Sequence, residues 1–408
     1  MKRLLLWLTL LGLNWNAWSQ QSQSQKPQLK IQMGHTSWVS KMYMLPDGKS
    51  FLTISNDRTI KQWDLNTGKE LKTFSGHSKA VKRVVLVPGQ KRFLSMDDRW
   101  IRYWNLTTGK EIWALKPHKS QLREVLLLPD AQSFVTGSFD KEAKHWDLKT
   151  GKIIKVFIGK SRGMRKLWFS PKNQLLLSYD AGSRIRGWNF KTGQKVIDFG
   201  RKLDSIGMVG QIRLIILPGE KEMLLANAHI IQHWNLAQGK LIKEMKAHQR
   251  VIERMVLLPD NKRVLTGDRA GRVILWNIKK GQPIKEYNEH RNRISGIYLF
   301  KRAKKMLTTS RDGVVKYWSL TKTASLKSYK AHPKGISDLV LLPNEKIFVT
   351  GDAYKKGVKS WSLVTGKQLN DLKVDGRRTL QLTFFPKMRT LITLIFLDDY
   401  IRFWDAAS

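Results

Sequence analysis

Histidine, serine and aspartate, the residue types of a hydrolytic triad, recur together along this chain of 408 residues. Ser138 and Asp140, for example, stand shortly before Trp146. A triad needs one exposed nucleophile beside an oriented base and an oxyanion site, whereas this constellation is repeated. Polar groups that recur in several copies are better explained as buried side chains that satisfy one another's hydrogen bonds. We therefore expect no catalytic residues and no enzyme activity.

Metal and phosphate chemistry have little support in the sequence. The histidines are spread along the chain, and only His229 and His233 lie close together, four residues apart in a predicted strand, where structural or surface roles fit better. The absence of cysteine excludes thiolate ligands and disulfides. The recurring Thr-Gly-Lys is typical of a hairpin turn rather than of a phosphate loop. We expect no metal and no cofactor.

An excess of positive charge is the feature that does indicate a function. The chain has 74 Lys and Arg against 32 Asp and Glu, which gives a formal net charge of +42. Because the basic residues are scattered through the whole sequence, the excess belongs to the folded body and not to a tail. It implies anionic partners.

A repeat organises the chain. Nine tryptophans, each followed by Asp, Asn or Ser, are separated by 41 to 46 residues: Trp63, Trp104, Trp146, Trp188, Trp234, Trp276, Trp318, Trp361 and Trp404. A period of about 40 to 45 residues that ends in Trp-Asp is typical of the four-stranded blade of a β-propeller. The first repeat shows the expected strands at residues 41–45, 50–55 and 59–63, with a turn at 46–48. The predicted fold class is therefore all-β.

The N-terminus predicts export. Residues 1–19 contain two basic residues, an apolar run and small residues before Gln20, as in a cleaved signal peptide; an uncleaved anchor is the alternative, although the apolar run is short for one. Residues 20–27 are polar and predict a disordered tether. Residues 28–33 match the strand that follows Trp-Asp in other repeats, so we expect this segment to close the last blade, which has no such strand after Trp404.

Over residues 28–408 the chain resembles the WD-repeat β-propeller family, and we expect it to be an exported, bacterial-type member. The resemblance implies polar sets in which a His before the first strand, a Ser or Thr, an Asp and the Trp hydrogen-bond one another. Three sets are complete by this pattern: His35, Ser55, Asp57 and Trp63; His118, Ser138, Asp140 and Trp146; His290, Ser310, Asp312 and Trp318. The second repeat, with His77, Asp98 and Trp104, has Met96 where the hydroxyl is expected.

Nine units exceed the seven or eight that are usual for this family. A single closed ring of nine units, over residues 28–408, is favoured because no linker divides the repeats and because the terminal strands fit together. Two smaller partial rings are the alternative. In either case we expect a monomer without a transmembrane segment once the signal is removed.

Arginine is concentrated in the loops expected on one rim, the top rim, while lysine predominates in the opposite loops. One position just before each apolar first strand should lie at the inner mouth of the top rim; around the ring these mouth positions are Lys41, Arg83, Glu124, Lys166, Arg213, Arg254, Gly296, Asp338 and Gln381. The cations among them form an arc that Arg165, Arg201 and Arg250 extend outward. These eight basic residues are the predicted partner-binding residues.

The function that the sequence favours is a non-enzymatic binding or scaffold protein, periplasmic or secreted, which holds an acidic protein or another anionic partner at the top rim. The alternative is direct binding of an anionic polymer, either nucleic acid or an anionic glycolipid or glycan.

Overall fold

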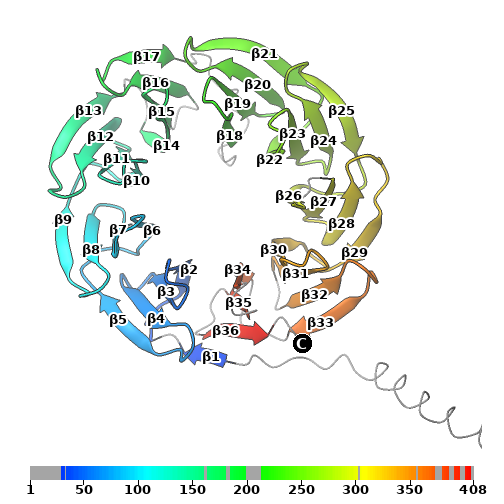
Figure 1. Cartoon of the computed structure of the whole chain (residues 1–408), viewed down its shortest axis with the longest axis horizontal. Coiled ribbons are helices and arrows are strands. Elements are labelled where there is room, and N and C mark those ends of the chain that lie inside the picture. Colours follow the sequence, from blue (N-terminus) through cyan, green and yellow to red (C-terminus); the bar gives the residue numbers. More distant parts are fainter. Residues whose placement is uncertain are drawn as a thin grey trace, which may run out of the picture.

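The computed structural model describes residues 29–32, 34–159, 163–180, 184–198, 213–301, 304–354, 357–372, 379–385, 390–395 and 400–405. These residues form nine four-stranded antiparallel sheets and no helix; eight sheets are meanders of consecutive strands, and the ninth takes its outer strand from the N-terminal part of the chain. Figure 1 shows the sheets arranged in a ring, with one strand of each facing the centre and one on the outside. This is the all-β propeller that the period of the tryptophans predicts. The predicted signal peptide and tether lie outside the described residues.

The strands occupy equivalent places from sheet to sheet. The inner strands are β2 (Val39–Met44), β6 (Arg83–Leu86), β10 (Leu122–Leu127), β14 (Met164–Ser170), β18 (Arg213–Ile216), β22 (Ile252–Leu257), β26 (Ile294–Leu299), β30 (Ile336–Leu341) and β34 (Thr379–Phe385). The second strands are β3 (Ser50–Ser55), β7 (Arg92–Met96), β11 (Ser133–Ser138), β15 (Leu175–Asp180), β19 (Glu222–Asn227), β23 (Arg263–Asp268), β27 (Lys305–Ser310), β31 (Ile347–Asp352) and β35 (Thr390–Ile395).

The third strands carry the repeated tryptophans. They are β4 (Ile60–Asp64), β8 (Ile101–Asn105), β12 (Glu142–Asp147), β16 (Ile185–Asn189), β20 (Ile230–Asn235), β24 (Val273–Asn277), β28 (Val314–Ser319), β32 (Val358–Ser362) and β36 (Tyr400–Asp405). The outer strands are β5 (Glu70–Phe74), β9 (Glu111–Leu115), β13 (Ile153–Ile158), β17 (Lys195–Asp198), β21 (Lys240–Lys246), β25 (Gln282–Tyr287), β29 (Lys327–Lys330), β33 (Gln368–Leu372) and β1 (Leu29–Gln32).

The residue after each tryptophan shapes the turn to the outer strand. Asp64 Oδ1 accepts hydrogen bonds from the backbone N–H groups of Asn66 and Thr67, at 3.0 and 2.7 Å, and from the Thr67 hydroxyl. Gly68 then takes a φ of 69°, in the left-handed region where glycine has no steric cost. Asp147 and Thr150 repeat this arrangement in the third sheet. The recurring Thr-Gly is therefore a side-chain-capped hairpin turn.

The last sheet joins the two ends of the chain. Its strand order is β1-β36-β35-β34, and β1 pairs antiparallel with β36, so that Leu29 lies opposite Phe403 and Gln32 opposite Tyr400. Both strands are side by side at the lower edge of the ring in Figure 1. Without β1, the backbone N–H and C=O groups of β36 would form an unpaired outer edge.

The hydrophobic core is divided among the interfaces between neighbouring sheets. Each buried cluster combines residues of two adjacent sheets; for example, Phe74 of the first sheet packs with Phe93 and Trp104 of the second. The same holds between the ninth and first sheets, where Ile392 and Leu394 share a cluster with Val39, Met42 and Trp63. Apolar burial therefore runs around the ring and holds each sheet through its neighbours.

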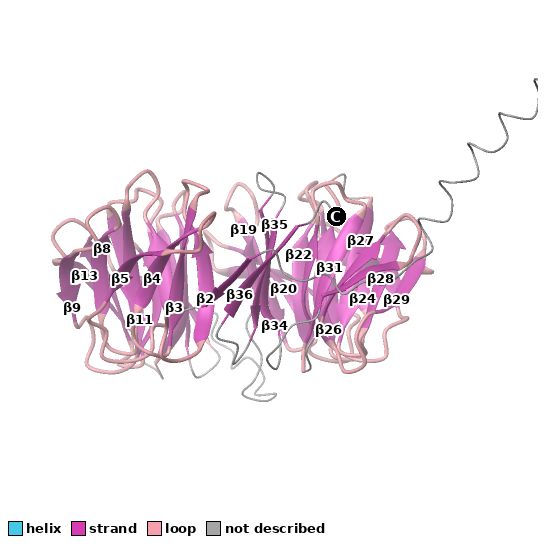
Figure 2. Cartoon of the chain, turned by 90° about the horizontal axis from the view of Figure 1, so that it is seen from below, coloured by secondary structure: helices cyan, strands magenta, loops and turns pink. Residues whose placement is uncertain are grey.

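Loops gather at the two faces of the ring, as the side view in Figure 2 shows. The loop before β2 and the turn between β3 and β4 lie at the same face, since the N–H of Asn56 donates to the carbonyl of Trp38 at 3.1 Å. This face is the top rim. The described residues include no helix of sufficient length and hydropathy to cross a membrane.

Candidate binding face

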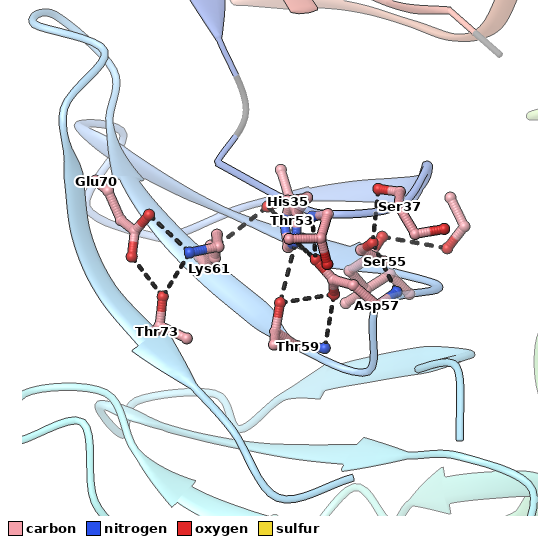
Figure 3. A network of polar contacts seen from close by, with 12 residues as sticks. His35, Ser37, Thr53, Ser55, Asp57, Thr59, Lys61, Glu70 and Thr73 are labelled. Atoms are coloured by element: carbon pink, nitrogen blue, oxygen red, sulfur yellow. Dashed lines mark hydrogen bonds and ion pairs between the residues drawn. The ribbon is translucent and has the colours of Figure 1, made fainter. Parts of the chain in front are cut away.

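The first sheet shows how a polar set is built at the top rim (Figure 3). His35 lies between Asp57 and Thr53: its Nδ1 is 2.7 Å from Asp57 Oδ2, and its Nε2 is 2.8 Å from Thr53 Oγ1. The indole N–H of Trp63 donates to the same Thr53 hydroxyl at 2.8 Å. The set therefore ties the loop before β2 to β3, β4 and the turn between them.

The hydroxyl of each set is not the serine that the sequence pattern selected. Ser55 instead donates to the carbonyl of Ser37 and accepts from the N–H of Asp57, both at 3.0 Å. In the third and seventh sheets the tryptophans donate to Thr136 and Thr308, and not to Ser138 or Ser310. Residues two apart in a strand share a face, so serine and threonine are both near the set, but only the threonine reaches the histidine and the tryptophan.

Three further sets are complete that the sequence pattern left partial. In the second sheet His77 lies 3.0 Å from Asp97 and 2.6 Å from Ser95, and Trp104 donates to Ser95. Asp98, the predicted member, bonds Lys82 and Gln121 instead. The sixth and eighth sheets have equivalent sets: His248, Thr266, Asp268 and Trp276; His332, Thr350, Asp352 and Trp361.

The fourth, fifth and ninth sheets are built differently. In the fourth, the guanidinium of Arg186 forms a buried ion pair with Asp180, in a repeat that has no histidine before its inner strand. In the fifth, His233 is buried and bonds Glu222 at 2.8 Å. In the ninth, Trp404 donates to Thr393 at 3.1 Å, and Asp398, which the sequence pattern selected, lies outside the described residues.

These sets are suited to stabilise the fold. Burial alone would raise the pKa of Asp97, but hydrogen bonds from His77 and from the N–H groups of Arg99 and Trp100 outweigh it and lower the pKa to about 2. Asp97 and the His77 side chain are fully buried, so a substrate has no access to them. A carboxylate held in this way remains charged and accepts hydrogen bonds at every ordinary pH.

One group in the described residues could bring three ligand atoms to a metal, namely His118, Asp140 and Glu142. The ring Nδ1 of His118 is already 2.9 Å from Asp140 Oδ2, and Glu142 pairs with Lys144 at 3.0 Å. All three side chains thus have partners within the protein, and the group is explained by the polar set of the third sheet. The pair His229 and His233 is not part of this group.

Most of the mouth positions follow a β-bulge in the inner strand. In seven inner strands the ladder to the second strand shifts by one residue immediately before the mouth position, as between Val39 and Lys41. Strands β6 and β18 begin at the mouth position itself, with Arg83 and Arg213. A bulge redirects the side chain that follows it. The bulge therefore gives seven of the nine residues a common place at the inner end of the top rim, and Arg83 and Arg213 take the equivalent place at the start of their strands.

Several mouth residues connect their sheet to the next one. Arg213 Nε donates to the carbonyl of Glu253, and Arg254 Nε donates to the carbonyl of Ser295, both at 2.7 Å. Arg83 forms an ion pair with Glu124 of the next sheet. Asp338 accepts from the N–H of Leu382, and the Gln381 amide bonds the backbone of Met42 across the junction of the ninth and first sheets. Arg83, Arg213 and Arg254 therefore contribute to the structure of the ring.

Lys41 and Lys166 differ from these arginines. Both are exposed, and in the described part of the chain neither has an acidic partner. Burial of the amine and then the neighbouring charges of Arg83 and Lys166 lower the pKa of Lys41; burial and then Arg83 and Arg213 lower that of Lys166. These couplings place the two lysines within the field of the arginine arc. Two side chains of the same charge without a counter-ion are what an anionic partner would stabilise.

The remaining predicted residues lie farther out. Arg250 is exposed and Arg165 is half-buried, and no bond from either side chain is recorded among the described residues. Arg201 lies outside the described residues. Three acids near the rim are engaged by other groups: Asp57 and Asp312 bond the histidines of their sets, and Asp98 bonds Lys82. Within the arc, Arg83 has an acidic partner in Glu124, whereas Lys41 and Lys166 have none among the described residues.

A cavity of about 420 Å³ opens beside Arg213 and Arg254 on this face. Its lining extends from Arg213 past Glu253, Arg254 and Arg293 to Arg311 and Thr379. Arg293 and Arg311 were not among the eight residues selected from sequence. The sequence could have indicated them, because both lie in top-rim loops of the same repeat, Arg293 before β26 and Arg311 after β27.

Comparison with known proteins finds four segments that match the model of one family. The model of the WD40 family, described as "WD domain, G-beta repeat", matches residues 26–64, 68–105, 109–147 and 281–319. These four segments, which make up less than half of the chain, resemble WD repeats, and they contain Trp63, Trp104, Trp146 and Trp318, each a member of a complete polar set.

Curated relatives match only short segments. A probable E3 ubiquitin ligase complex SCF subunit, sconB, of Arthroderma otae is 33% identical over 69 residues, or 17% of this chain and 10% of the relative. An F-box protein of Saccharomyces cerevisiae is 38% identical over 52 residues, 13% of this chain and 8% of the yeast protein. A pre-mRNA-splicing factor of Eremothecium gossypii is 41% identical over 71 residues, 15% of this chain and 17% of that factor. The chain thus spans less than a fifth of each relative's length.

A solved structure supports the fold. The crystal structure of the computationally designed Ika8 protein superimposes with a TM-score of 0.59 and 21% sequence identity, covering 83% of this chain and all of Ika8. At this identity the likeness concerns the fold alone.

Proposed function

Because four of its segments match the WD-repeat model and the chain folds as a β-propeller, we propose that it is a non-enzymatic binding platform that holds an acidic partner protein at its top rim. Propellers of this family typically serve as scaffolds for protein interactions, and the named relatives are subunits or factors of larger assemblies. The partner is proposed here from charge alone. An acidic surface is the chemistry that this rim would attract.

The observation that carries the proposal is the arc of cations at the mouth positions. Five of the nine are basic, and Lys41 and Lys166 have no acidic partner among the described residues. A rigid ring holds these charges in place, so binding a complementary surface does not require the protein to order itself first. The resulting field would speed association and favour acidic partners over neutral ones.

Substitutions that test this proposal must change the charge of the rim without breaking contacts between sheets. Reversing Arg83, Arg213 or Arg254 would break contacts between sheets as well as change the charge. The better triple variant is Lys41→Glu, Lys166→Glu and Arg250→Glu, because none of these three side chains bonds another residue in the described part of the chain. Its matched control on the opposite loops is Lys110→Glu, Lys240→Glu and Lys367→Glu, with the same change in net charge.

The test is capture of partner proteins by the folded protein from an extract of its own cells, at about 150 mM salt, where charges farther apart than about 8 Å are screened. We expect the top-rim triple variant to lose the captured partner while the control retains it. Equal loss in both variants would mean that only bulk charge matters, and the top-rim proposal would be rejected.

Direct binding of an anionic polymer is the second candidate, favoured by the net charge of +42. It predicts a steep fall in affinity with salt and little preference among sequences, since counter-ion release supplies most of the binding energy. Titration of a fluorescent DNA oligonucleotide and of anionic lipid vesicles at two salt concentrations separates the candidates. Salt-insensitive capture of one protein favours the first candidate.

We further propose that the protein acts in the periplasm or outside the cell, as its first 19 residues suggest. Expression of the full chain with a C-terminal tag, followed by cell fractionation and N-terminal sequencing, tests this. The expected mature N-terminus is Gln20. An intact N-terminus in the cytoplasm would overturn the proposal.

A further inference from the structure

The outer strand of the third sheet, β13, exposes more apolar side chains than the other outer strands. Ile153, Ile154, Val156 and Ile158 are all exposed, and Ile158 keeps 68% of its accessible surface. Among the other outer strands whose side chains are described, β21 exposes two large apolar residues and the rest expose at most one. Single apolar residues are common on protein surfaces, but four in one strand of six residues form a patch that indicates an interaction site.

The backbone of β13 can also take part in an interaction. The third sheet has the strand order β10-β11-β12-β13, and in the described part of the chain β13 pairs only with β12. Figure 1 shows β13 on the outside of the ring. Alternate N–H and C=O groups of an edge strand point away from its sheet, where they can pair with another strand. A strand laid along β13 would therefore gain main-chain hydrogen bonds.

The two faces of β13 have different surroundings. Lys155 Nζ donates to the carbonyl of Phe190 at 3.4 Å, and the ring of Phe157 stacks on Phe190 with 5.5 Å between the ring centres. This face is therefore covered by the fourth sheet. Residues two apart in a strand share a face, so the opposite face carries three β-branched, exposed side chains: Ile154, Val156 and Ile158. The single charged residue of β13 is turned away from them.

Two other outer strands contain the residues that normally prevent an edge from pairing. Strand β25 has Pro283 and Glu286, and β21 has Glu244 and Lys246 beside its two exposed apolar residues. Proline and charged side chains oppose the addition of another strand. Strand β13 has neither proline nor an acidic residue. It therefore lacks the protection that these two strands have.

Exposed lysines flank both ends of β13. Lys149 and Lys152 lie in the turn that leads into the strand, and both are exposed. At the other end the N–H of Gly159 donates to the carbonyl of Lys141 at 2.8 Å, which brings the exposed Lys141 beside the end of the strand. An apolar strand between two positively charged ends is complementary to an apolar segment that has acidic residues at its ends.

We propose that β13 binds an extended segment of a partner protein, in which alternate residues are apolar and both ends are acidic, and that this segment adds to the four-stranded third sheet as a fifth strand. Main-chain hydrogen bonds would supply affinity. The side chains that come to lie beside Ile154, Val156 and Ile158 would supply selectivity. This surface is on the outer wall of the ring, so the proposal is independent of the top rim.

A second copy of this chain fits the surface less well. Each copy carries a formal net charge of +42, so two copies repel each other. A contact along six residues is also short for the roughly 800 Å² per partner that stable interfaces bury.

Fluorescence anisotropy of labelled peptides with the folded protein, at about 150 mM salt, tests strand addition. The probe is Glu-Glu-Val-Thr-Val-Thr-Val-Glu-Glu; one control has proline in place of the central valine, and the other has lysine in place of every glutamate. We expect the probe to bind about tenfold more tightly than either control, because proline removes a main-chain donor and lysine reverses the charge of the ends. Equal binding of either control, or no binding of the probe up to about 1 mM, overturns the proposal.

Substitutions locate the site. Ile154→Lys with Ile158→Lys should weaken binding of the probe about tenfold, because charged side chains oppose pairing at an edge. Leu241→Lys with Ile242→Lys makes the same change in charge on β21 and should leave binding unchanged. Equal loss in the two pairs overturns the assignment to β13. If the first pair lowers the melting temperature, Ile154→Thr with Ile158→Thr keeps β-branched side chains and the net charge, and must still weaken binding for the proposal to stand.

Sedimentation of the parent protein separates a partner segment from a second copy. We expect a monomer. A dimer that Ile154→Lys with Ile158→Lys converts to a monomer would assign β13 to a second copy and overturn the proposal. The top-rim triple variant changes no residue of β13, so loss of peptide binding and loss of partner capture can be observed separately.

Discussion

The third and fourth sheets differ in how they hold the aspartate near the end of their second strand. Each has a tryptophan packed at the interface between sheets and an aspartate that must be held at the end of its second strand. In the third sheet a histidine and a threonine hold Asp140 and Trp146. In the fourth, Arg186 of β16 neutralises Asp180 of β15 directly.

The difference concerns which parts of the sheet are connected. His118 precedes the inner strand, so its set ties the junction from the second sheet to the third, whereas Arg186 and Asp180 lie on adjacent strands of one sheet. A hydrogen-bonded network around one carboxylate and a buried ion pair also respond differently to loss of a member. We therefore expect sheets without a histidine set to depend more on strand pairing and on charge.

The largest effect is expected in the ninth sheet, where no histidine set occurs in the sequence and the outer strand is borrowed from the N-terminus. Deletion of residues 28–33 exposes the edge of β36 and should destabilise the whole ring, because each sheet is held through its neighbours. Thermal unfolding of a chain that begins at residue 20, with and without residues 28–33, measures the loss of stability. An unchanged melting temperature would show that closure contributes nothing. Deletion of residues 20–27 alone is the control.

In the fourth sheet, Arg186→Ala should cost about 3 to 5 kcal/mol of unfolding free energy, the usual result of leaving a buried charge without its ionic partner. Chemical denaturation measures the change. The double variant Arg186→Met with Asp180→Asn removes both charges and should cost less than Arg186→Ala. A double variant that is worse than the single one would contradict the ion-pair explanation.

In the third sheet, Asp140→Ala should cost less, about 1 to 3 kcal/mol, because the groups left behind are a neutral histidine and two backbone N–H groups. Thr136→Val should fall in the same range, since Trp146 and His118 both lose their hydroxyl. Ser138→Ala provides the comparison, because Ser138 bonds only backbone groups, the carbonyl of Gln121 and the N–H of Asp140, and neither His118 nor Trp146. A larger effect at Ser138 than at Thr136 would restore the serine as the central hydroxyl.

Acid should weaken the histidine sets in a defined range of pH. The pKa of Asp97 is lowered to about 2 from an ordinary value of 3.8, so its contribution to stability is complete above about pH 4 and is lost as the pH falls towards 2. Denaturation of the parent protein and of Asp97→Asn between pH 5 and pH 2 checks this. The stability difference between them should shrink as the pH falls. A constant difference would separate the effect from ionisation of Asp97.

The smallest effect on stability is expected at the exposed mouth lysines. Lys41→Gln and Lys166→Gln should change the free energy of unfolding by no more than about 0.5 kcal/mol, because neither side chain forms a recorded bond. Removing like charges that repel each other could only help the fold. A loss above about 1 kcal/mol would place these lysines among the structural residues with Arg213 and Arg254.

The sequence was sufficient for the fold because one tryptophan at a regular spacing marks the third strand of each sheet. It was less informative about the polar sets. Thr53 and Ser55 share a face of β3, and the adjacent Asp97 and Asp98 both fit the turn, so only the side-chain geometry tells which one meets the histidine.

The top rim was predicted as a surface, but the role of each cation was not. Arg213 and Arg254 reach from the mouth position to a backbone carbonyl of the next sheet, and the sequence does not show which mouth residues find such an acceptor. Arg254 finds such a carbonyl at Ser295, whereas Lys41 does not. The cavity was missed for the same reason, since it depends on the spacing of three neighbouring repeats.

The pairing of β1 with β36 also has a consequence for the order of events during synthesis. Ribosomes add about 5 to 20 residues per second, so roughly 20 to 80 seconds separate the appearance of the first strand from that of its partner. During this time the earlier sheets can fold in succession, each against the one before it, while Leu29–Gln32 waits unpaired. The ring is thus closed last by β1, the strand that is synthesised first. A chain that ends before β36 lacks the strand with which β1 pairs and cannot close the ring.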